Sequence, residues 1–436
     1  MVQFQQDVES PRQISDVAAR LRQAVLDREV TPDEVLTIFD AWGKKLDARQ
    51  LDEIPGIVFL RMWLRRGTLE PIIARELGPN SLHGGWNDYG LATCKAFPLG
   101  VIGHWPAANV EIQPILSMTC ALLGGNAALV RIPHGLNELT RVLVQRLVEG
   151  DPDEILMRRI FLAAFDHGRR DLHEAMAQAV DGAMIWGGRA SVLQVRSLPF
   201  PHWARLAVFG PRISVAAMDA GAWTDPAERE PWCRRLARDL WQFDQQACSS
   251  PQVLFLEKDS SHSTAELAPL LQRAFEDENR VHPRTIIPPG LTTAIAQARA
   301  SWLLKDPAHT AVFPSNPDWT LLFGSGPEIP QPTQGKTLAV LEVDNLLDPI
   351  ARLDGNVQTL GLGVSDPEKE RVLAELAGRR GIDRIVKLGR MHAFVPPWDG
   401  LDLIRPMVRM VRHVSSVNEY DNESASKRLE GCYGIS

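Results

Sequence analysis

Strand-like and helix-like segments alternate along most of this chain, and the alternation restricts the folds that it can adopt. An apolar run over 95–102 is followed by a helical pattern over 113–123 and by a second strand-like run over 127–131. Parallel strands need a crossover connection, so strand, helix and strand in succession are typical of a parallel sheet. We therefore predict an α/β fold.

The same alternation continues to about residue 364. We expect helices over 136–149, 171–178, 189–198, 225–246, 265–275 and 292–304, and strands over 159–164, 205–209, 213–218, 253–256, 337–343 and 357–364, with a further strand ending at Ile185. Apolar residues over 10–77 recur at spacings of three and four, which indicates amphipathic helices at the start of the chain. Residues 403–411 are predicted to form a basic amphipathic helix, and 415–436 a polar tail.

Length, charge and cysteine content narrow the class of protein. The chain has 436 residues, whereas single cores stop growing at roughly 250–300, so two substantial domains are expected. A net charge of -7 without a basic cluster argues against binding to nucleic acid or an anionic membrane. Residues 1–12 lack a secretory pattern, and the five cysteines form no CxxC pair. We expect a cytoplasmic protein that acts on a small molecule, with no metal site.

One cysteine differs from the others in its surroundings. Cys94, Cys120 and Cys233 fall within strand or helix patterns, and Cys432 lies in the tail, so core or surface roles are expected for them. Cys248 lies in a loop between the predicted helix and the next strand, where Pro251 and two serines prevent the helix from continuing. Loops carry catalytic groups, so Cys248 is a candidate nucleophile, with an ordinary loop cysteine as the alternative.

Two further segments are candidates for binding phosphate or ribose. Trp186-Gly187-Gly188-Arg189 stands at a strand-to-helix junction, where backbone N–H groups and a helix N-terminus can approach a phosphate. Arg131 ends a predicted strand, at the edge where ligands bind in open parallel sheets. The alternatives are an ordinary turn and a surface arginine.

Taken in order, these residues resemble the aldehyde dehydrogenase superfamily, and more closely its LuxC-type acyl-CoA reductase branch. Residues 98–103, Pro-Leu-Gly-Val-Ile-Gly, with Asn109 are similar to the superfamily pattern PxGVxGxxxPWN, and 125–131 to AGNxxVxK. The Trp186-Gly187-Gly188 turn is similar to the superfamily's pyrophosphate turn. Residues 243–252, Phe-Asp-Gln-Gln-Ala-Cys-Ser-Ser-Pro-Gln, resemble the branch's nucleophile loop almost letter for letter.

The resemblance implies a fold and an activity. A helical lead-in over 1–94 is expected to pack on a Rossmann-type dinucleotide-binding domain over 95–243. A second α/β domain over 244–412 would be catalytic, and 413–436 would form the tail. The implied reaction is the NADPH-dependent reduction of an acyl thioester, on CoA or a carrier protein, to an aldehyde. A homo-oligomer and an acyl-transferring partner enzyme are further expectations.

The resemblance also assigns roles to residues. Cys248 would carry the acyl group and Asn109 would hold the oxyanion. The cofactor would contact Gly103, Arg131, Trp186, Gly187, Gly188 and Arg189. The fixed charge of Arg131, where the superfamily has a lysine, favours NADP(H) over NAD(H).

One departure from the superfamily bears on the reaction. Aldehyde oxidisers carry a glutamate in ELGGK that activates water, whereas the similar stretch here, 208–212, reads Val-Phe-Gly-Pro-Arg. Without that base the acyl-cysteine should persist until it accepts hydride. Two alternatives remain open: an NAD(P)-dependent aldehyde dehydrogenase, and a catalytically silent acyl-binding protein. His104 and His392 could tune the thiol, with structural roles as the alternative. Trp105, Trp186 and Trp398 are expected mainly to fill the core, with the lining of an acyl channel as the alternative.

Overall fold

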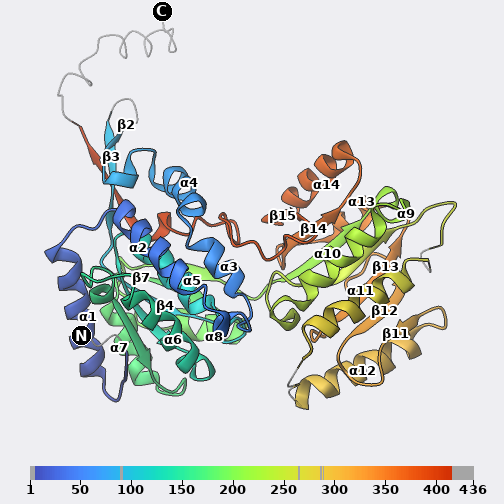
Figure 1. Cartoon of the computed structure of the whole chain (residues 1–436), viewed down its shortest axis with the longest axis horizontal. Helices are drawn as coiled ribbons and strands as arrows, with labels where there is room; N and C mark the ends of the chain where they lie inside the picture. The colour runs from blue at the N-terminus through green and yellow to red at the C-terminus, as the bar shows by residue number, and fades with distance from the viewer. Residues whose placement is uncertain (1–4, 89–91, 264–265, 285–286, 288, 415–436) are drawn as a thin grey trace, which may run out of the picture.

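Two lobes, each built on a mostly parallel sheet, lie side by side in the computed structural model (Figure 1). The structure describes residues 5–88, 92–263, 266–284, 287 and 289–414. Within these ranges, no helix is both long enough and apolar enough to cross a bilayer.

The first sheet has the strand order β1-β6-β5-β4-β7-β8, and all neighbours are parallel. Its strands are β1 (Gln5–Asp7), β4 (Val101–Trp105), β5 (Ala127–Ile132), β6 (Ile160–Ala164), β7 (Gly182–Trp186) and β8 (Arg205–Phe209). From β4 the chain builds outward through β5 and β6, and then returns to add β7 and β8 on the other side. This reversal of order between β4 and β7 opens a crevice at the carboxyl ends of those strands, where ligands bind in folds of this class.

Helices cover both faces of the first sheet, because each has one apolar side to bury. One face is covered by α1 (Pro11–Asp27), α7 (Arg170–Ala179) and α8 (Arg189–Arg196). The other is covered by α2 (Pro32–Lys45), α3 (Ile57–Trp63), α4 (Arg66–Leu77), α5 (Gln113–Leu123) and α6 (Asn137–Val148). Capping boxes at Ser10 and Thr31, each followed by proline, fix where α1 and α2 begin.

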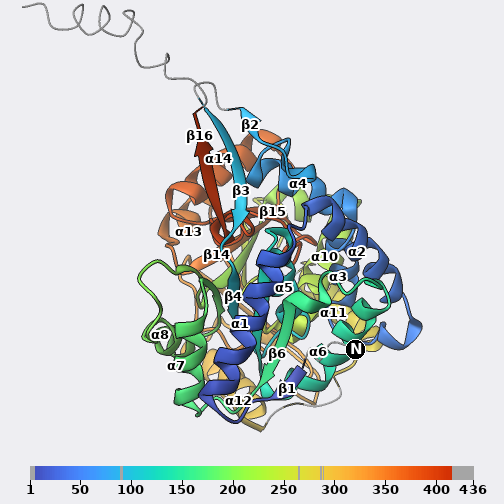
Figure 2. The same ribbon diagram turned by 90° about the vertical axis from the view of Figure 1, so that its left-hand side faces the viewer.

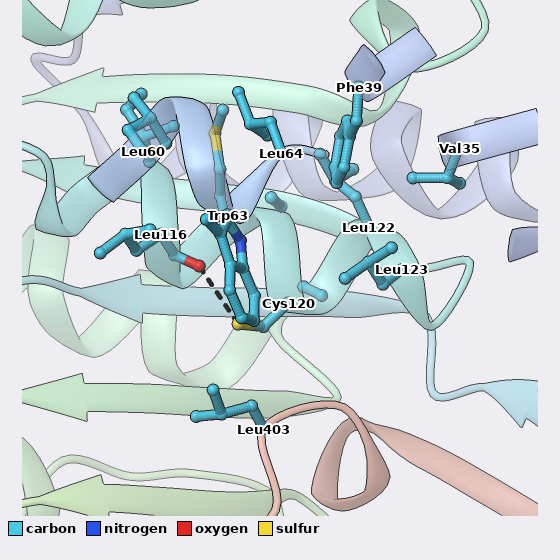
Figure 3. Packing of buried hydrophobic residues seen from close by; sticks show 14 of the residues in the cluster. Val35, Phe39, Leu60, Trp63, Leu64, Leu116, Cys120, Leu122, Leu123 and Leu403 are labelled. Atoms are coloured by element: carbon cyan, nitrogen blue, oxygen red, sulfur yellow. Dashed lines mark hydrogen bonds between the residues drawn. The ribbon is translucent and has the colours of Figure 1, made fainter. Parts of the chain in front are cut away.

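The helical lead-in contacts α5 through large apolar side chains (Figure 3). Trp63 is buried, and its indole N–H donates to Thr119 Oγ1 at 2.9 Å. Cys120 lies beside it in the same core, and its Sγ contacts the Leu116 carbonyl oxygen at 3.1 Å. Cys120 therefore has the structural role expected of a cysteine in a helix core.

The second sheet has the order β11-β12-β13-β10-β9-β14-β15, parallel except for the edge strand β11. Its strands are β9 (Ile213–Met218), β10 (Pro251–Glu257), β11 (Thr310–Val312), β12 (Thr320–Ser325), β13 (Thr337–Val343), β14 (Val357–Gly363) and β15 (Arg384–Lys387). One face packs against α9 (Ala220–Thr224), α10 (Arg229–Trp241) and α11 (Ala268–Val281). The other packs against α12 (Pro289–Lys305), α13 (Leu347–Arg352) and α14 (Pro367–Arg379).

The last described residues return to the first lobe, where β16 (Val408–His413) pairs antiparallel with β3 (Thr93–Pro98). With β2 (Asn87–Asp88) they form a three-stranded sheet, seen extending from the lobe in Figure 2. The helix expected over 403–411 is therefore wrong. Part of its apolar spacing falls on a short 3-10 turn, Arg405–Met407, in which Met407 is buried, and the strand forms because a tertiary partner overrides local periodicity.

Two other expectations also need correction. The run over 95–102 is two strands in different sheets, because Gly100, with φ of 137°, turns the chain where a side chain would collide with Asp181. The chain passes from the first sheet to the second between β8 and β9, at 210–212. The boundary expected at 243 is too late, because β9 already pairs with β10 and β14 of the second sheet. The tail over 415–436, with Cys432, lies outside the described residues.

Candidate active site

A cavity of about 290 Å³ lies between the two lobes and contains Cys248 in its wall. The first lobe contributes residues that follow β4 and β7, among them Asn109 and Gly187. The second lobe contributes the amino ends of β9 and β10, at Ile213 and Gln252. The carboxyl ends of one sheet thus face the amino ends of the other across the cavity.

A strained turn carries the chain from α10 to Cys248. The helix expected over 225–246 ends at Trp241, and Phe243, Asp244 and Gln245 follow with φ of 54°, 53° and 59°. Non-glycine residues in this region cost on the order of 1–3 kcal/mol each, so surrounding contacts must hold them there. These strained residues lie within 243–252, the segment that resembles the LuxC-type nucleophile loop almost letter for letter.

Buried polar contacts hold this turn in place. The Gln245 side-chain amide donates to the carbonyl oxygens of Pro251 and Thr337, both at 2.8 Å, and its oxygen accepts the Thr337 N–H at 2.8 Å. Asp244 pairs with Arg284 at 2.7 Å and with Lys336 at 3.4 Å, and both cations are almost fully buried. Hydrogen bonds from Gln245 and ion pairs from Asp244 therefore hold the turn against the rest of the second lobe.

The thiol of Cys248 has both polar and charged neighbours. Burial raises the pKa of Cys248 to about 11, the Asp399 carboxylate adds to the rise, and Gln358 and Arg384 oppose it. The residue keeps some exposure toward the cavity. Ser214 Oγ donates to the Cys248 carbonyl oxygen at 2.7 Å and fixes the backbone next to the sulfur.

Asn109 reaches the nucleophile loop from the opposite lobe. Its side-chain amide donates to the Gln246 carbonyl oxygen at 2.7 Å, two residues before Cys248. A primary amide has two N–H donors, so a second one remains for a ligand in the cavity. The structure thus brings together Cys248 and Asn109, which are 139 positions apart in the chain.

Asp399 is the cavity carboxylate that we did not expect. Its side chain is 7% exposed, accepts a hydrogen bond from the Gln358 amide, and lies 3.8 Å from Arg212 Nη1. Burial raises the pKa of Asp399, and Gln358 and Arg212 oppose that rise. Asp399 has φ of 50° and precedes Gly400, whose φ is 73°, so a left-handed turn presents this carboxylate.

His392 also lines the cavity, and its contacts fix its tautomer. Nε2 lies 2.7 Å from the Asp239 carbonyl oxygen, which can only accept, so Nε2 carries the hydrogen. Nδ1 must then accept from Ser249 Oγ, at 2.9 Å. Burial lowers the pKa of His392 to about 4, so the ring is neutral near pH 7. Through Ser249, the residue after Cys248, His392 is bonded to the nucleophile loop.

A second cavity, of about 350 Å³, adjoins the first on the side of the first lobe. Asn109, Trp186, Gly187 and Gly188 line both cavities, and Arg131 lines the second. Gly187 has φ of 150°, which suits glycine, and a Cβ on Gly188 would meet no atom within 4 Å. Arg131 Nε is buried without a partner among the described residues. Arg170, for which we had assigned no binding role, and Trp105 also line this cavity.

Three of the sequence candidates do not reach either cavity wall. Gly103 lies inside β4, where a Cβ would press on Trp105 and Val180. His104 is buried beside it with Nδ1 2.8 Å from Ser117 Oγ, and burial lowers the pKa of His104 to about 3. Arg189 begins α8 but is not part of either lining.

The remaining tryptophans combine packing with lining. Trp186 stacks on Phe209 at 3.7 Å and donates to Ser117 Oγ at 2.9 Å, while one side lines the cavities. Trp398 lines the Cys248 cavity and packs over the Arg384 guanidinium at 4.1 Å. At the position of the superfamily glutamate, 208–212, the cavity wall has no carboxylate, and Arg212 is paired with Asp383 instead.

A comparison with protein families decides where the chain belongs, because the model of the acyl-CoA reductase (LuxC) family matches residues 9–413. This chain belongs to that family. It is 23% identical over 368 residues to the long-chain acyl-protein thioester reductase of Vibrio harveyi, covering 82% of this chain and 72% of the relative. The protein of the same name from Aliivibrio fischeri is 21% identical over 371 residues, covering 84% and 74%.

Solved structures share the fold of this LuxC-family chain at low identity. An aldehyde dehydrogenase of Brucella melitensis biovar abortus matches with a TM-score of 0.71 and 12% identity, over 93% of this chain and 89% of that one. An NADP-dependent enzyme of Escherichia coli matches with a TM-score of 0.69 and 12% identity, over 93% and 90%. The aldehyde dehydrogenase-like α/β fold predicted from the sequence is confirmed.

Proposed function

We propose that this protein reduces a long-chain acyl thioester to an aldehyde, with NADPH as the reductant and Cys248 as the acyl carrier. The observation that carries the proposal is the placement of Cys248 and Asn109 in one cavity that adjoins the Gly187–Gly188 cavity. The names of the relatives, long-chain acyl-protein thioester reductases, support the choice of substrate class.

The first half of the reaction moves the acyl group to the protein. Cys248 Sγ gives its proton to solvent and attacks the thioester carbonyl carbon, and the resulting oxyanion accepts a hydrogen bond from the Asn109 amide. The bond from that carbon to the donor's sulfur then breaks. The donor sulfur takes up a proton and leaves as a thiol, and the acyl group remains on Cys248.

The second cavity has the features that a dinucleotide requires. The Gly187–Gly188 turn leaves room for a pyrophosphate next to the start of α8, which no side chain caps. The unpartnered Arg131 Nε and the nearby Arg170 supply positive charge for a 2'-phosphate, which favours NADPH over NADH. When bound there, the cofactor supplies a hydride to the acyl carbon.

The second half of the reaction releases the aldehyde. Once reduced, the acyl carbon is part of a thiohemiacetal on Cys248, whose oxygen Asn109 again contacts. Collapse breaks the carbon–sulfur bond, frees the aldehyde and leaves the Cys248 thiolate, which takes a proton from water. Apolar side chains on the other side of the cavity fit a hydrocarbon chain: Phe59, Ile112, Leu116, Phe243 and Phe394.

One observation favours a second candidate, the oxidation of aldehydes to acids. Asp399 lines the cavity and could activate water to cleave the acyl-cysteine, as the ELGGK glutamate would. Its contacts with Gln358 and Arg212 occupy the carboxylate and speak against that role.

Product analysis tests the proposal. The protein is incubated with decanoyl-CoA and NADPH, or with decanal and NADP, and the organic products are identified by mass spectrometry. We expect decanal from the first mixture, and little decanoic acid from the second when no thiol acceptor is present. Decanoic acid as the main product of both mixtures would favour the second candidate and overturn the first.

A further inference from the structure

A third cavity, of about 420 Å³, lies in the second lobe between α12 and the strands β12 and β13. Two of its lining residues, Gln252 and Pro332, also line the Cys248 cavity. Gln252 stands four residues after Cys248, at the start of β10. The third cavity therefore adjoins the Cys248 cavity on the second lobe's side, while the Gly187–Gly188 cavity adjoins it on the first lobe's side.

Two residues of its wall carry buried polar atoms that have no partner within the described part of the chain. Gln252 is 7% exposed, and its amide nitrogen donates to the Ser250 carbonyl oxygen at 3.3 Å, which leaves Oε1 as an unpaired acceptor. Thr337 is 4% exposed, and its Oγ1 is unpaired as well. An unpaired buried polar group destabilises the folded protein, and a ligand with matching groups would offset that cost.

The rest of the lining describes the ligand further. Trp302 and Leu322 supply apolar surface, and Lys305, the last residue of α12, supplies an exposed positive charge. The matching ligand is a slender chain with amide N–H and C=O groups, apolar methylenes and an anionic far end. A pantetheine-type thiol arm has these properties, and its sulfur end would have to reach Cys248.

We infer that this cavity binds the pantetheine arm of the acyl donor, with its amides at Gln252 and Thr337 and its phosphate end toward Lys305. The inference rests on the proposed function, since it identifies the donor of that reaction. Its consequence is that the donor arm and the cofactor occupy opposite sides of Cys248. The free thiol can therefore leave without displacing the cofactor.

Acylation kinetics test this site without any cofactor. The rate of Cys248 acylation, followed by quenched intact-mass analysis, is compared for decanoyl-pantetheine and for S-ethyl decanethioate, which lacks the arm. We expect the wild type to favour the pantetheine thioester at least tenfold. Ala298→Trp, which fills the cavity from α12, should lower that ratio at least fivefold.

Matched variants separate the site from general effects. Ala300 lies on the same helix but is exposed and does not line the cavity, so Ala300→Trp should leave the ratio unchanged. Gln252→Leu keeps the volume and removes the acceptor, so the ratio should fall about two- to tenfold, as expected for one lost hydrogen bond. Decanoyl-CoA and a decanoyl carrier protein distinguish the two sources of the arm: the faster donor is the source, and Ala298→Trp must slow it.

A binding measurement distinguishes failure of the site from failure of the proposed function. Pantetheine is titrated calorimetrically into Cys248→Ser and into the double variant Cys248→Ser/Ala298→Trp. Binding to Cys248→Ser but not to the double variant supports the site. If no thioester acylates the wild type, that result refutes the proposed reaction and leaves the site standing. A ratio near one in the wild type, or equal binding to both proteins, would overturn the inference. So would loss of a dimer in Ala298→Trp without pantetheine binding, because the cavity would then be a subunit interface.

Discussion

Cys248 keeps its proton near pH 7 in the free protein, because burial raises the pKa of its thiol to about 11. A thiolate is the reactive form, so this raised pKa predicts slow alkylation of the resting protein. The neighbours that can change this state are Asp399, Gln358 and Arg384. After burial, which has the largest effect, the pKa of this thiol therefore depends on one carboxylate against an amide donor and a guanidinium.

The first prediction concerns that balance. Asp399→Asn removes a negative charge beside the sulfur, so the pKa of Cys248 should fall, and iodoacetamide should label it faster at pH 8. The measurement is the alkylation rate of Cys248 from pH 7 to 10.5 in the absence of substrate. Asp402→Asn is the control, because Asp402 pairs with Arg75 and does not line the cavity. An unchanged or rising pKa in Asp399→Asn would contradict this account of the thiol.

Single residues of the site were predictable only where the sequence has a local signature. The loop around Cys248 and the turn at Gly187–Gly188 have such signatures, and the structure places both at the cavities. Asp399 was not predictable, because no local pattern separates it from the many other acidic residues. Its role in the cavity depends on contacts with residues far away in the chain, such as Arg212 and Gln358.

At the scale of elements, α3 supports the nucleophile loop through a glycine. Gly56 precedes α3 with φ of 85°, and a Cβ at this position would lie 2.5 Å from the Phe243 ring. Phe243 is itself in a left-handed conformation, next to the other strained residues of the loop. The start of a helix in the lead-in and the loop of Cys248 are therefore fitted to each other.

The second prediction tests this fit. Gly56→Ala adds backbone strain and a collision with Phe243, so the free energy of unfolding should fall by about 1–3 kcal/mol, and acylation of Cys248 should slow. Gly67→Ala is the matched control, because Gly67 lies in α4 with no atom within 4 Å of its Cβ position. There the helix preference of alanine should stabilise the protein by up to about 1 kcal/mol. Urea unfolding measures both; equal effects of the two variants would contradict the fit.

Elements differed in how well the sequence predicted them. Helices with regular apolar spacing and caps, such as α1 and α2, were predictable because their signals are local. The strand β16 was mistaken for part of a helix, because only its partner β3, more than 300 positions earlier, determines its conformation. The division at Gly100 was missed for a similar reason, since Asp181 defines the space there.

For the whole molecule, the site exists only because the two lobes meet. Asn109 comes from the first lobe and Cys248 from the second, and the hydrogen bond from Asn109 to the Gln246 carbonyl oxygen joins them. The alternation of strands and helices was enough to predict the fold class, because it is repeated along most of the chain. That the two lobes meet at the site was not predictable from the residues alone. Only the family resemblance led to that expectation.

The third prediction uses this arrangement. Asn109→Ala removes an oxyanion donor, so the rate of acylation by decanoyl-CoA should fall by about 10²-fold or more. Pre-steady-state mass analysis measures that rate, and circular dichroism checks that the fold is intact. A variant with wild-type acylation would remove Asn109 from the scheme.

The central claim is that Cys248 carries the acyl group and releases it as an aldehyde. Intact-mass analysis after mixing the protein with decanoyl-CoA should show one decanoyl adduct on the wild type and none on Cys248→Ala. Addition of NADPH should then remove the adduct and yield decanal. An adduct that persists with NADPH, one that is lost to water at the same rate without it, or one that forms equally on Cys248→Ala would contradict the account.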